Sequence, residues 1–304
     1  MTAATKKDRL EARVGAVVVD YDTGSVLGDC LTSLVAERVG EIVVVENGDR
    51  AGAKAALADS GHGDVPLIET GRNLGYGAGA NRGIAALAPR PYVLVCNPDL
   101  HVHPGAVAGL ADALDAEPSW AIVGPRILTP AGDPYPSARR FPTVSDAAGH
   151  ALLDQLWADN PFTRRYRAGG WTAPEPTTTD WVSGACFLAR RSALDELGGF
   201  DEAYFMFAED MDLCWRAHEA GWKVGFVPGV EVTHIEGVSR RAHPYAMALA
   251  HHRSALRFAG RTTTGWRRAL LPVAAIVLAL RLALRCGRLA VASRSSDRPP
   301  GEAT

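Results

Sequence analysis

Asp99 is the first residue whose position suggests chemistry. It follows a run of apolar, strand-forming residues that ends at Asn97 and Pro98, so a carboxylate stands directly after a buried strand. An oxygen ligand at such a place suits Mg²⁺ or Mn²⁺ that is held jointly by the protein and a diphosphate. The same aspartate can also be a turn residue, or the N-cap of the helix predicted in HPGAVAGLADAL (103–114).

A cluster of three carboxylates, Glu209, Asp210 and Asp212, follows an aromatic run at residues 204–207. The helix dipole favours acidic residues in the first turn of a helix, which explains part of this cluster. Three carboxylates within four residues are more than capping requires. Because a carboxylate beside an apolar wall can act as a general base, the cluster is a candidate for acid–base chemistry.

His234 ends the apolar stretch VEVTH. A single histidine is more often structural than a ligand, although imidazole is a common metal ligand. Together with Asp99, it gives the sequence two candidate ligands for a divalent ion.

The first half of the chain alternates apolar runs with stretches of helical spacing. The runs predict buried strands at 14–20, 42–47, 65–70 and 92–97, and the stretches between them predict helices at 25–36, 51–61 and 81–88. This pattern is typical of an α/β fold with a doubly wound, mostly parallel central sheet. Ligands bind beyond the carboxyl ends of the strands in such sheets, so Tyr21, Glu46 and Asp99 should line one crevice.

The second half has a different character. Residues 130–180 are rich in Pro, Gly and Thr and are predicted to form loops. A strand and a helix are predicted in 181–200, followed by a helix from about Glu209 to Gly221. The chain then reads as strand, turn and strand up to His234.

The glycine-rich stretch NLGYGAGANRG (73–83) admits more than one interpretation. Its spacing is neither that of a dinucleotide fingerprint nor that of a phosphate loop, and it follows the third strand instead of the first. The glycines can serve a tight turn and close packing. A flexible loop beside a helix N-terminus can also help to hold a nucleotide, with Asn81 as a candidate donor-binding residue.

Composition narrows the class of protein. The 304 residues are 47% hydrophobic and 22% charged, which is enough for one large core or two modest ones. The five cysteines show no C-x-x-C pair and no metal-ligand spacing, which indicates reduced thiols and a cytoplasmic protein. The first residues, MTAATKKDRLEAR, contain no apolar stretch, so no signal peptide is expected.

The net charge of −2 conceals an asymmetry between the two ends of the chain. From Gly237 onward there are 12 arginines and two acidic residues, a balance of +10. Residues 1–236 carry 20 basic and 32 acidic residues, a balance of −12. This distribution predicts a basic tail with an anionic partner, either a membrane or a nucleic acid.

The tail contains an uncharged apolar run of 12 residues, from Ala269 to Leu280. That is short of the roughly 20 residues that a helix needs to span a bilayer. Arg281, Arg285 and Arg288 share one helix face, and Leu278, Leu282 and Leu289 lie largely away from it. The pattern predicts an amphipathic helix that lies on an anionic membrane surface. The alternative is a helix that packs on the catalytic domain or on a second subunit, which would make a homo-oligomer.

In its order of motifs, the chain resembles the family 2 glycosyltransferases with the GT-A fold, and within them the bacterial rhamnosyltransferases. The resemblance covers about residues 13–236 and rests on VVVDYDTG, IVVVENGD, NLGYGAGANRGI, LVCNPDLHV and the long segment from WVSGACF to VEVTH. It implies a nucleotide-sugar-binding half at 13–129 and an acceptor-binding and catalytic half at 130–236. A flexible N-terminus at 1–12 and a basic helical, membrane-associating tail at 237–304 complete the expected organisation.

The resemblance implies a donor site at the strand ends. Tyr21 falls where the family contacts the nucleotide base, and Glu46 falls where an aspartate contacts base or ribose. Asn97 and Asp99 match the D-x-D position, with Asn in the first place, so that both belong to the donor site and Asp99 remains the metal ligand. His234 matches a histidine that completes the metal site in some members.

The resemblance also implies the catalytic and acceptor residues. Asp210 matches the catalytic base, and its neighbour Glu209 is counted with the acceptor site. Trp181 and Gly184 fall on a segment that borders donor and acceptor.

The activity implied by the resemblance is an inverting glycosyl transfer that depends on Mg²⁺ or Mn²⁺. The implied donor is thymidine-diphospho-β-L-rhamnose, and the implied acceptor is N-acetylglucosamine on a polyprenyl diphosphate, in cell-wall polysaccharide biosynthesis. Another nucleotide sugar or another glycan acceptor is the alternative. The enzyme is expected to be cytoplasmic and peripheral on the inner face of the cell membrane.

Two other classes fit less well. A nucleotidyltransferase needs a Gly-rich loop with Arg and Lys directly after the first strand, and DYDTGSVLGDC has neither Arg nor Lys. A nucleic-acid-binding protein could use the Arg-rich tail. Because that tail mixes Arg with long aliphatic runs and has Trp266 as its only interleaved aromatic residue, lipid is the favoured partner and no nucleic acid is expected.

Overall fold

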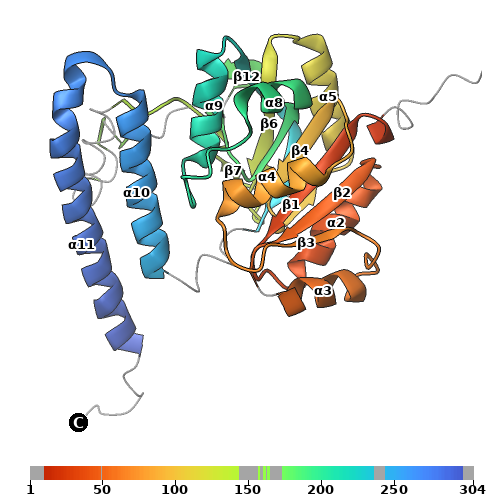
Figure 1. Cartoon of the computed structure of the whole chain (residues 1–304), viewed down its shortest axis with the longest axis horizontal. Helices are drawn as coiled ribbons and strands as arrows, with labels where there is room; N and C mark the ends of the chain where they lie inside the picture. The colour runs from red at the N-terminus through yellow and green to blue at the C-terminus, as the bar shows by residue number, and fades with distance from the viewer. Residues whose placement is uncertain are drawn as a thin grey trace, which may run out of the picture. The chain divides into compact units, whose positions relative to one another are not determined.

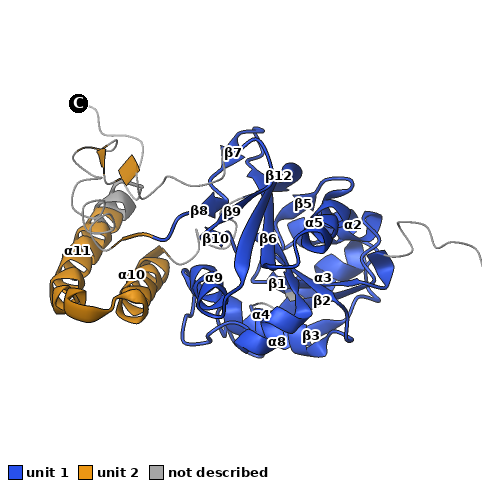
Figure 2. Cartoon of the chain, turned by 90° about the horizontal axis from the view of Figure 1, so that it is seen from above, with its two compact units in different colours: residues 1–141, 167–239 blue, residues 142–166, 240–304 orange. Residues whose placement is uncertain are grey.

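The structure is a computed structural model that describes residues 10–48, 50–143, 157, 160, 161, 163, 164, 173–235 and 244–296 (Figure 1). The chain divides into two compact units (Figure 2). Unit 1 comprises residues 1–141 and 167–239, and unit 2 comprises residues 142–166 and 240–304. The central sheet belongs to unit 1, and two long C-terminal helices belong to unit 2.

Unit 1 is built on one mixed sheet with the strand order β3-β2-β1-β4-β11-β6-β12-β5. The pairs β3–β2, β2–β1, β1–β4 and β6–β12 are parallel, which confirms the predicted doubly wound, mostly parallel sheet. β11 runs antiparallel between β4 and β6, and β5 runs antiparallel to β12. The strands on this path are β1 (Val14–Asp20), β2 (Glu41–Glu46), β3 (Leu67–Glu69), β4 (Tyr92–Cys96), β5 (Leu100–Val102), β6 (Trp120–Leu128), β11 (Cys186–Arg190) and β12 (Lys223–His234).

Helices cover both faces of the sheet (Figure 1). Side chains of α2 (Val26–Ala36), α3 (Arg50–Asp59) and α5 (Ala106–Ala116) contribute to one hydrophobic cluster. Side chains of α4 (Tyr76–Ala86), α8 (Arg191–Leu197) and α9 (Glu209–Glu219) contribute to the other.

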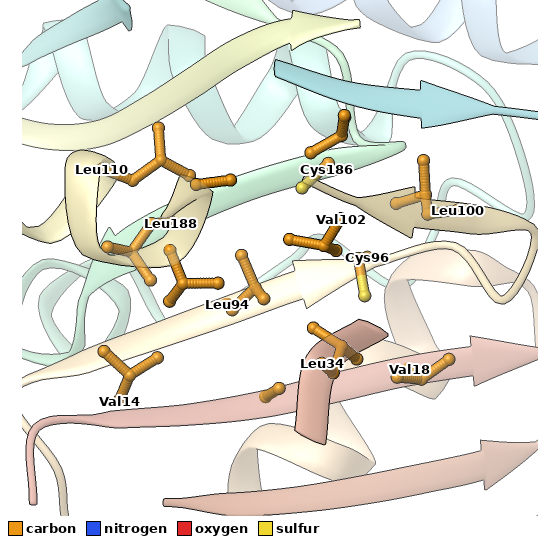
Figure 3. Close-up of a cluster of buried hydrophobic side chains, with 14 of the residues drawn as sticks. Val14, Val18, Leu34, Leu94, Cys96, Leu100, Val102, Leu110, Cys186 and Leu188 are labelled. Carbon is orange, nitrogen blue, oxygen red and sulfur yellow. The ribbon is translucent and has the colours of Figure 1, made fainter. Parts of the chain in front are cut away.

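The strands read as unbroken apolar runs because successive side chains point to opposite faces and both faces are covered. In β1, Val14 and Val18 lie in the first cluster and Val17 lies in the second. Figure 3 shows the first cluster, in which the β1 valines lie near Leu34 of α2 and Leu94 of β4. Burying each such side chain stabilises the fold by about 1.5–3 kcal/mol, so the strand ends that carry the polar residues are held on a rigid frame.

Among the strands on this path, β5 and β6 were not predicted. Because β5 begins at Leu100 and α5 begins only at Ala106, Asp99 precedes a strand, and its interpretation as a helix N-cap is wrong. The predicted strand, turn and strand up to His234 is one continuous strand, β12, whose register against β6 shifts between Val227 and Glu231.

The glycine-rich stretch is helical from Tyr76 onward, and residues 73–75 precede the helix as a short loop. α4 begins at Tyr76, five residues before the predicted start, and Gly75 at its N-cap has φ +89°. A Cβ on Gly83 would lie 2.3 Å from a methyl carbon of Val17, and a Cβ on Gly77 would lie 2.9 Å from Cβ of Phe200. The interpretation of these glycines as packing residues is therefore confirmed, and a role of residues 73–75 in holding a nucleotide stays a prediction.

The region predicted to form loops contains three short strands among its described residues. They are β7 (Pro134–Tyr135), β8 (Ala138–Arg139) and β9 (Thr177–Thr179). β8 pairs with β10 (Trp181–Val182) in a separate two-stranded sheet. Most of the residues between 144 and 172 lie outside the described part of the chain.

Unit 2 contains α10 (Pro244–Thr262), the 3₁₀ turn Gly265–Leu270 and α11 (Leu271–Ser296), with α10 and α11 side by side. Pro272 is the second residue of α11, where a helix tolerates proline. By length and composition, the segment Gly265–Leu289 is apolar enough to cross a membrane, and it is the one such segment among the described residues. The uncharged run from Ala269 to Leu280, which is too short to span a bilayer by itself, is therefore only part of a longer apolar segment. Arginines near the ends of such a helix can extend their charged groups to the membrane interface.

The exposed apolar side of α11 differs from the predicted one. Its large exposed residues are Val273 (58%), Ile276 (61%), Leu280 (60%) and Leu284 (61%), which recur at three or four residues. The leucines expected to face lipid, Leu278, Leu282 and Leu289, are partly buried.

Candidate active site

Asp99 and His234 form a close pair. The Nε2 atom of His234 lies 3.0 Å from Oδ1 of Asp99, and both residues are buried, with 5% and 8% of their surfaces exposed. The antiparallel pairing of β5 with β12 places His234 opposite Leu100, and Ile235 N–H donates to the Asp99 carbonyl (2.9 Å). Asn97 completes the group, because its Nδ2 lies 3.2 Å from the same imidazole nitrogen.

This pair suits a divalent ion but cannot hold one alone. A carboxylate oxygen suits both Mg²⁺ and Mn²⁺, whereas an imidazole nitrogen suits transition-metal ions better than Mg²⁺. Within the described residues there is no group of three or more His, Cys, Asp and Glu side chains that could bind a metal. An ion at Asp99 and His234 would therefore take most of its ligands from a diphosphate and from water.

Asp210 is held by backbone donors on both carboxylate oxygens. Gly184 N–H donates to Oδ2 (2.7 Å), and Met211 N–H donates to Oδ1 (2.8 Å). Burial raises the pKa of Asp210, and the Gly184 and Met211 donors and the charge of Arg139 oppose that rise. A side chain at position 184 would crowd Asp210, since a Cβ there would lie 3.1 Å from Cβ of Asp210.

Glu209 is buried beside Asp210. Burial and the neighbouring carboxylate raise the pKa of Glu209 to about 8. Hydrogen bonds to a carboxylate favour its ionised form, and the two donors from Gly184 and Met211 face Asp210. Of the two carboxyls, Glu209 is therefore the one that favours the protonated form, and Asp210 is the one whose ionised form is stabilised by its donors.

Asp212 has a structural partner. It is fully buried, and its Oδ2 accepts a hydrogen bond from Nε of Arg216 at 2.7 Å. The same guanidinium donates to the carbonyls of Leu197 and Gly199 (2.7 Å each). Asp212 thus fixes the loop before α9 through Arg216 and is the weaker candidate for a base.

Tyr76 joins the parts of the site. Its hydroxyl donates to the Gly184 carbonyl (2.6 Å), and its N–H donates to the Phe205 carbonyl (3.0 Å). It therefore ties together the two segments that flank Asp210. The backbone before α9 is itself unusual, because Phe207 and Ala208 have φ values of +67° and +63°, a conformation that persists only where the surroundings enforce it.

The Asp99 group and the Asp210 group lie at the same edge of the sheet. The link is direct, since Asn97 N–H donates to the carbonyl of Ala185 (2.8 Å), the residue after Gly184. The two groups lie close together because β11, which follows Gly184 and Ala185, pairs antiparallel with β4, which ends just before Asn97.

The predicted donor residues divide into two groups. Tyr21 and Glu46 lie at the ends of β1 and β2, where a Cβ on Gly48 would meet the Tyr21 ring at 2.8 Å. Asn81 is engaged elsewhere, because its amide exchanges hydrogen bonds with the backbone N–H and carbonyl of Phe200 (2.9 Å each). The structure thus brings Tyr21 and Glu46 together and gives Asn81 a packing partner.

Glu46 faces a second buried carboxyl, that of Asp20. Glu46 accepts a hydrogen bond from Gly48 N–H, and Asp20 accepts one from the Thr23 hydroxyl. Burial and the Asp20 charge raise the pKa of Glu46 to about 8, and burial also raises the pKa of Asp20. At neutral pH this pair retains a proton.

Trp181 lies on β10 opposite Arg139 of β8. Its indole N–H donates to the carbonyl of Arg140 (3.1 Å), and the guanidinium carbon of Arg139 lies 5.2 Å from the centre of its ring. The sequence interpretation did not identify Arg139 or Tyr76. A two-residue strand shows no periodicity, and a tyrosine in a glycine-rich stretch gives no sign of its distant partner.

The fold and the arrangement of these groups agree with the family that the sequence suggests. Residues 12–253 match the model of the family described as "Glycosyltransferase like family 2", so the chain belongs to that family and is a glycosyltransferase.

One similar protein is the N-acetylglucosaminyl-diphospho-decaprenol L-rhamnosyltransferase of Mycobacterium tuberculosis. It is 39% identical over 267 residues, which are 84% of this chain and 86% of that protein. The low-salt glycan biosynthesis hexosyltransferase Agl10 of Haloferax volcanii is 26% identical over 66% of this chain and 61% of its own length.

Solved structures support the GT-A fold. GalNAc-T7 with UDP, GalNAc and Mn²⁺ has a TM-score of 0.56 at 16% identity, over 86% of this chain and 53% of that one. TarS 1–349 of S. aureus has a TM-score of 0.51 at 13% identity, over 88% of this chain and 71% of that one.

Proposed function

We propose that this enzyme transfers L-rhamnose, with inversion, from thymidine-diphospho-β-L-rhamnose to N-acetylglucosamine carried on a polyprenyl diphosphate, a step of cell-wall polysaccharide synthesis. The similarity to the mycobacterial rhamnosyltransferase, at 39% identity over most of both chains, supports this donor and acceptor. The carboxylate of Asp210, buried and held by two backbone N–H groups beside the Asp99–His234 pair, is the observation that carries the reaction type.

In the proposed mechanism, Asp210 accepts the proton of the acceptor hydroxyl as that oxygen bonds to the anomeric carbon. The bond between the anomeric carbon and the donor's diphosphate oxygen breaks in the same step, so the configuration inverts. Gly184 and Met211 hold the carboxylate in place while it takes up the proton. A general base in this position contributes about 10²–10⁴ in rate.

Asp99 and His234 would hold Mg²⁺ or Mn²⁺, with Asn97 offering a neutral contact. When bound, the ion neutralises the charge that develops on the leaving diphosphate. The solved structure of GalNAc-T7, which shares this fold, contains Mn²⁺, and this supports a divalent ion in the present enzyme.

The donor and acceptor are tested by a panel of nucleotide sugars, with release of nucleoside diphosphate and product mass as readouts. A short-chain prenyl diphosphate that carries N-acetylglucosamine serves as acceptor. Transfer is expected with the thymidine-linked L-rhamnose donor and inverted configuration in the product. Preferred transfer of a different sugar would overturn the proposed donor.

Metal dependence is tested with chelator and with Asp99→Ala. Excess EDTA should abolish transfer, Mg²⁺ or Mn²⁺ should restore it, and Asp99→Ala should lose donor binding together with turnover. Because the protein supplies only two ligands, calorimetry should show weak metal binding without the nucleotide. Full activity in excess EDTA would contradict a metal at this pair.

We further propose that α11 attaches the enzyme to an anionic membrane, where a polyprenyl acceptor resides. The exposed stripe Val273, Ile276, Leu280 and Leu284 offers an apolar surface, and Arg281 and Arg285 can reach anionic headgroups. Replacing Ile276 and Leu280 by Asn should abolish sedimentation with anionic liposomes, whereas Val35→Asn, an exposed valine of unit 1, should not.

Deletion of residues 266–304 should have the same effect and leave transfer to the short-chain acceptor measurable. Release of the full chain from liposomes by high salt would indicate a helix that lies on the surface. Retention after alkaline carbonate extraction would indicate a helix that spans the bilayer instead. Undiminished sedimentation of the truncated protein would exclude α11 as the anchor.

A further inference from the structure

Arg139 is held rigidly but keeps hydrogen-bonding capacity. Its Nε donates to the Pro136 carbonyl (2.7 Å), which within the described residues is the one hydrogen bond of its guanidinium. The guanidinium carbon lies 5.2 Å from the ring centre of Trp181 and 5.5 Å from that of Tyr135. Both terminal nitrogens therefore remain available to a ligand, and the two neighbouring rings restrict the positions that the guanidinium can adopt.

Arg139 lies near the catalytic carboxylate. It stands opposite Trp181 in the β8–β10 pair, and Ser183 N–H donates to the Ser137 carbonyl (2.8 Å), so the chain passes from this pair directly into Gly184. Gly184 in turn donates to Asp210. The positive charge is close enough to lower the pKa of Asp210.

The Asp99–His234 pair and Arg139 belong to different structural elements. Asp99 and His234 lie at the junction of β5 and β12, whereas Arg139 belongs to the separate β8–β10 sheet. A donor diphosphate has the Asp99–His234 pair as its partner. An acceptor in which a diphosphate adjoins the reacting sugar carries a second anionic group into the same site, and that group also needs a cation.

We propose that Arg139 binds the diphosphate of the lipid-linked acceptor, and this inference rests on the proposed function. A planar guanidinium with two free terminal nitrogens matches phosphate oxygens in a bidentate manner. Stacking on Trp181 and Tyr135 reduces the side-chain entropy that binding would otherwise cost. Arg139 thereby selects acceptors with a diphosphate over neutral glycosides of the same sugar.

The test compares Arg139→Gln with Arg140→Gln, a matched control, because Arg140 is the exposed neighbour and the charge change is the same. Each full-length variant is assayed with a short-chain prenyl-diphosphate acceptor and with a neutral alkyl glycoside of N-acetylglucosamine. Arg139→Gln should raise KM for the diphosphate acceptor by about tenfold or more. KM for the donor and for the neutral acceptor should stay within about twofold of the wild type.

Three outcomes would overturn the proposal. Equal rises in KM for the two acceptors would mean that Arg139 does not recognise the diphosphate, a raised KM for the donor would assign Arg139 to the donor diphosphate, and unchanged kinetics would mean that Arg139 binds neither substrate. Arg139→Lys, which keeps the charge but loses the bidentate geometry of the guanidinium, should give an intermediate KM for the diphosphate acceptor. Thermal unfolding of each variant shows whether a loss comes from folding.

The proposed function can fail separately. If the wild type transfers nothing to either acceptor, that failure concerns the reaction. Calorimetry with geranyl diphosphate in the presence of nucleoside diphosphate and Mg²⁺ then tests Arg139 itself. Weaker binding by at least fivefold in Arg139→Gln supports the proposal, and equal affinity in the two proteins overturns it.

Discussion

Two pairs of buried carboxylic acids in unit 1 differ in the donors that face them. Asp20 and Glu46 face each other, with the Thr23 hydroxyl and Gly48 N–H as their donors, and burial raises the pKa of both. Glu209 and Asp210 are also buried, but two backbone N–H groups and the charge of Arg139 act on Asp210.

The comparison shows that burial alone does not make a base. Burial raises the pKa of Glu46 and of Glu209 to about 8, so each pair retains a proton at neutral pH. Only Asp210 has a donor on each oxygen together with a nearby cation. An ionised carboxylate that can accept a proton is therefore expected at Asp210, whereas the Asp20–Glu46 pair stores a proton.

Asp210→Asn should have the largest effect, because it keeps the shape of the side chain and removes the proton acceptor. Turnover should fall by about 10² or more, with little change in donor affinity measured by calorimetry. Asp212→Asn is the control, since it breaks the buried pair with Arg216 and should lower the melting temperature. A nearly normal Asp210→Asn beside an inactive but stably folded Asp212→Asn would reverse the assignment.

Tyr76→Phe should reduce turnover by roughly tenfold, since Gly184 loses its anchor and its N–H is held less firmly against Asp210. Loss of a donor to the ionised form raises the pKa of Asp210. The rise of kcat with pH should therefore move to higher pH. Tyr92→Phe also removes a partly buried hydroxyl, bound to Asp115, and should leave the pH profile of kcat unchanged.

Glu209→Gln should change turnover by less than about threefold at pH 6–7, because Glu209 already carries a proton there. Above pH 8 the wild-type glutamate ionises beside Asp210, and the variant cannot. The pH profile of kcat in the alkaline range should therefore differ between the two proteins. A large loss at pH 6–7 would mean that Glu209 is ionised in the working enzyme.

Glu46→Gln should have the smallest effect, on stability. The pKa of Glu46 is raised from 4.5 to about 8, so its contribution to the free energy of unfolding is full below pH 4.5 and is lost as the pH rises through about 8. At pH 8 the variant should melt about 2–4 °C above the wild type, and at pH 4 the two should agree more closely. Glu69→Gln, at an exposed carboxylate on β3, should show no such pH dependence.

Sequence patterns predicted the elements with strong periodicity and the residues at their ends. β1, β2, β4 and α9 carry apolar runs or a carboxylate-rich first turn, and Asp99 and the carboxylate cluster that contains Asp210 follow from them, whereas the choice of Asp210 within the cluster came from the family resemblance. The start of α4 was missed because glycines lower helix propensity, and contacts with Val17 and Phe200 override that preference.

The connections within the site were beyond prediction for a different reason. The hydroxyl of Tyr76 meets a carbonyl 108 residues away, and no local pattern encodes such a partner. Arg139 lies on the two-residue strand β8, and its partner strand β10 comes only after a long segment whose sequence shows no periodic pattern. Both contacts arise from tertiary packing and appear only once the sheet is assembled.

The position of β11 between β4 and β6 also bears on how the chain is made. A ribosome completes β1 to β4 long before it reaches Cys186–Arg190, and until then β4 is an edge strand with a fully apolar sequence. At about 5–20 residues per second, that edge stays unpaired for several seconds or longer. An open edge of this kind is a template for association with other nascent chains. The same late strand that completes the active site thus makes the growing polypeptide a natural client for chaperones.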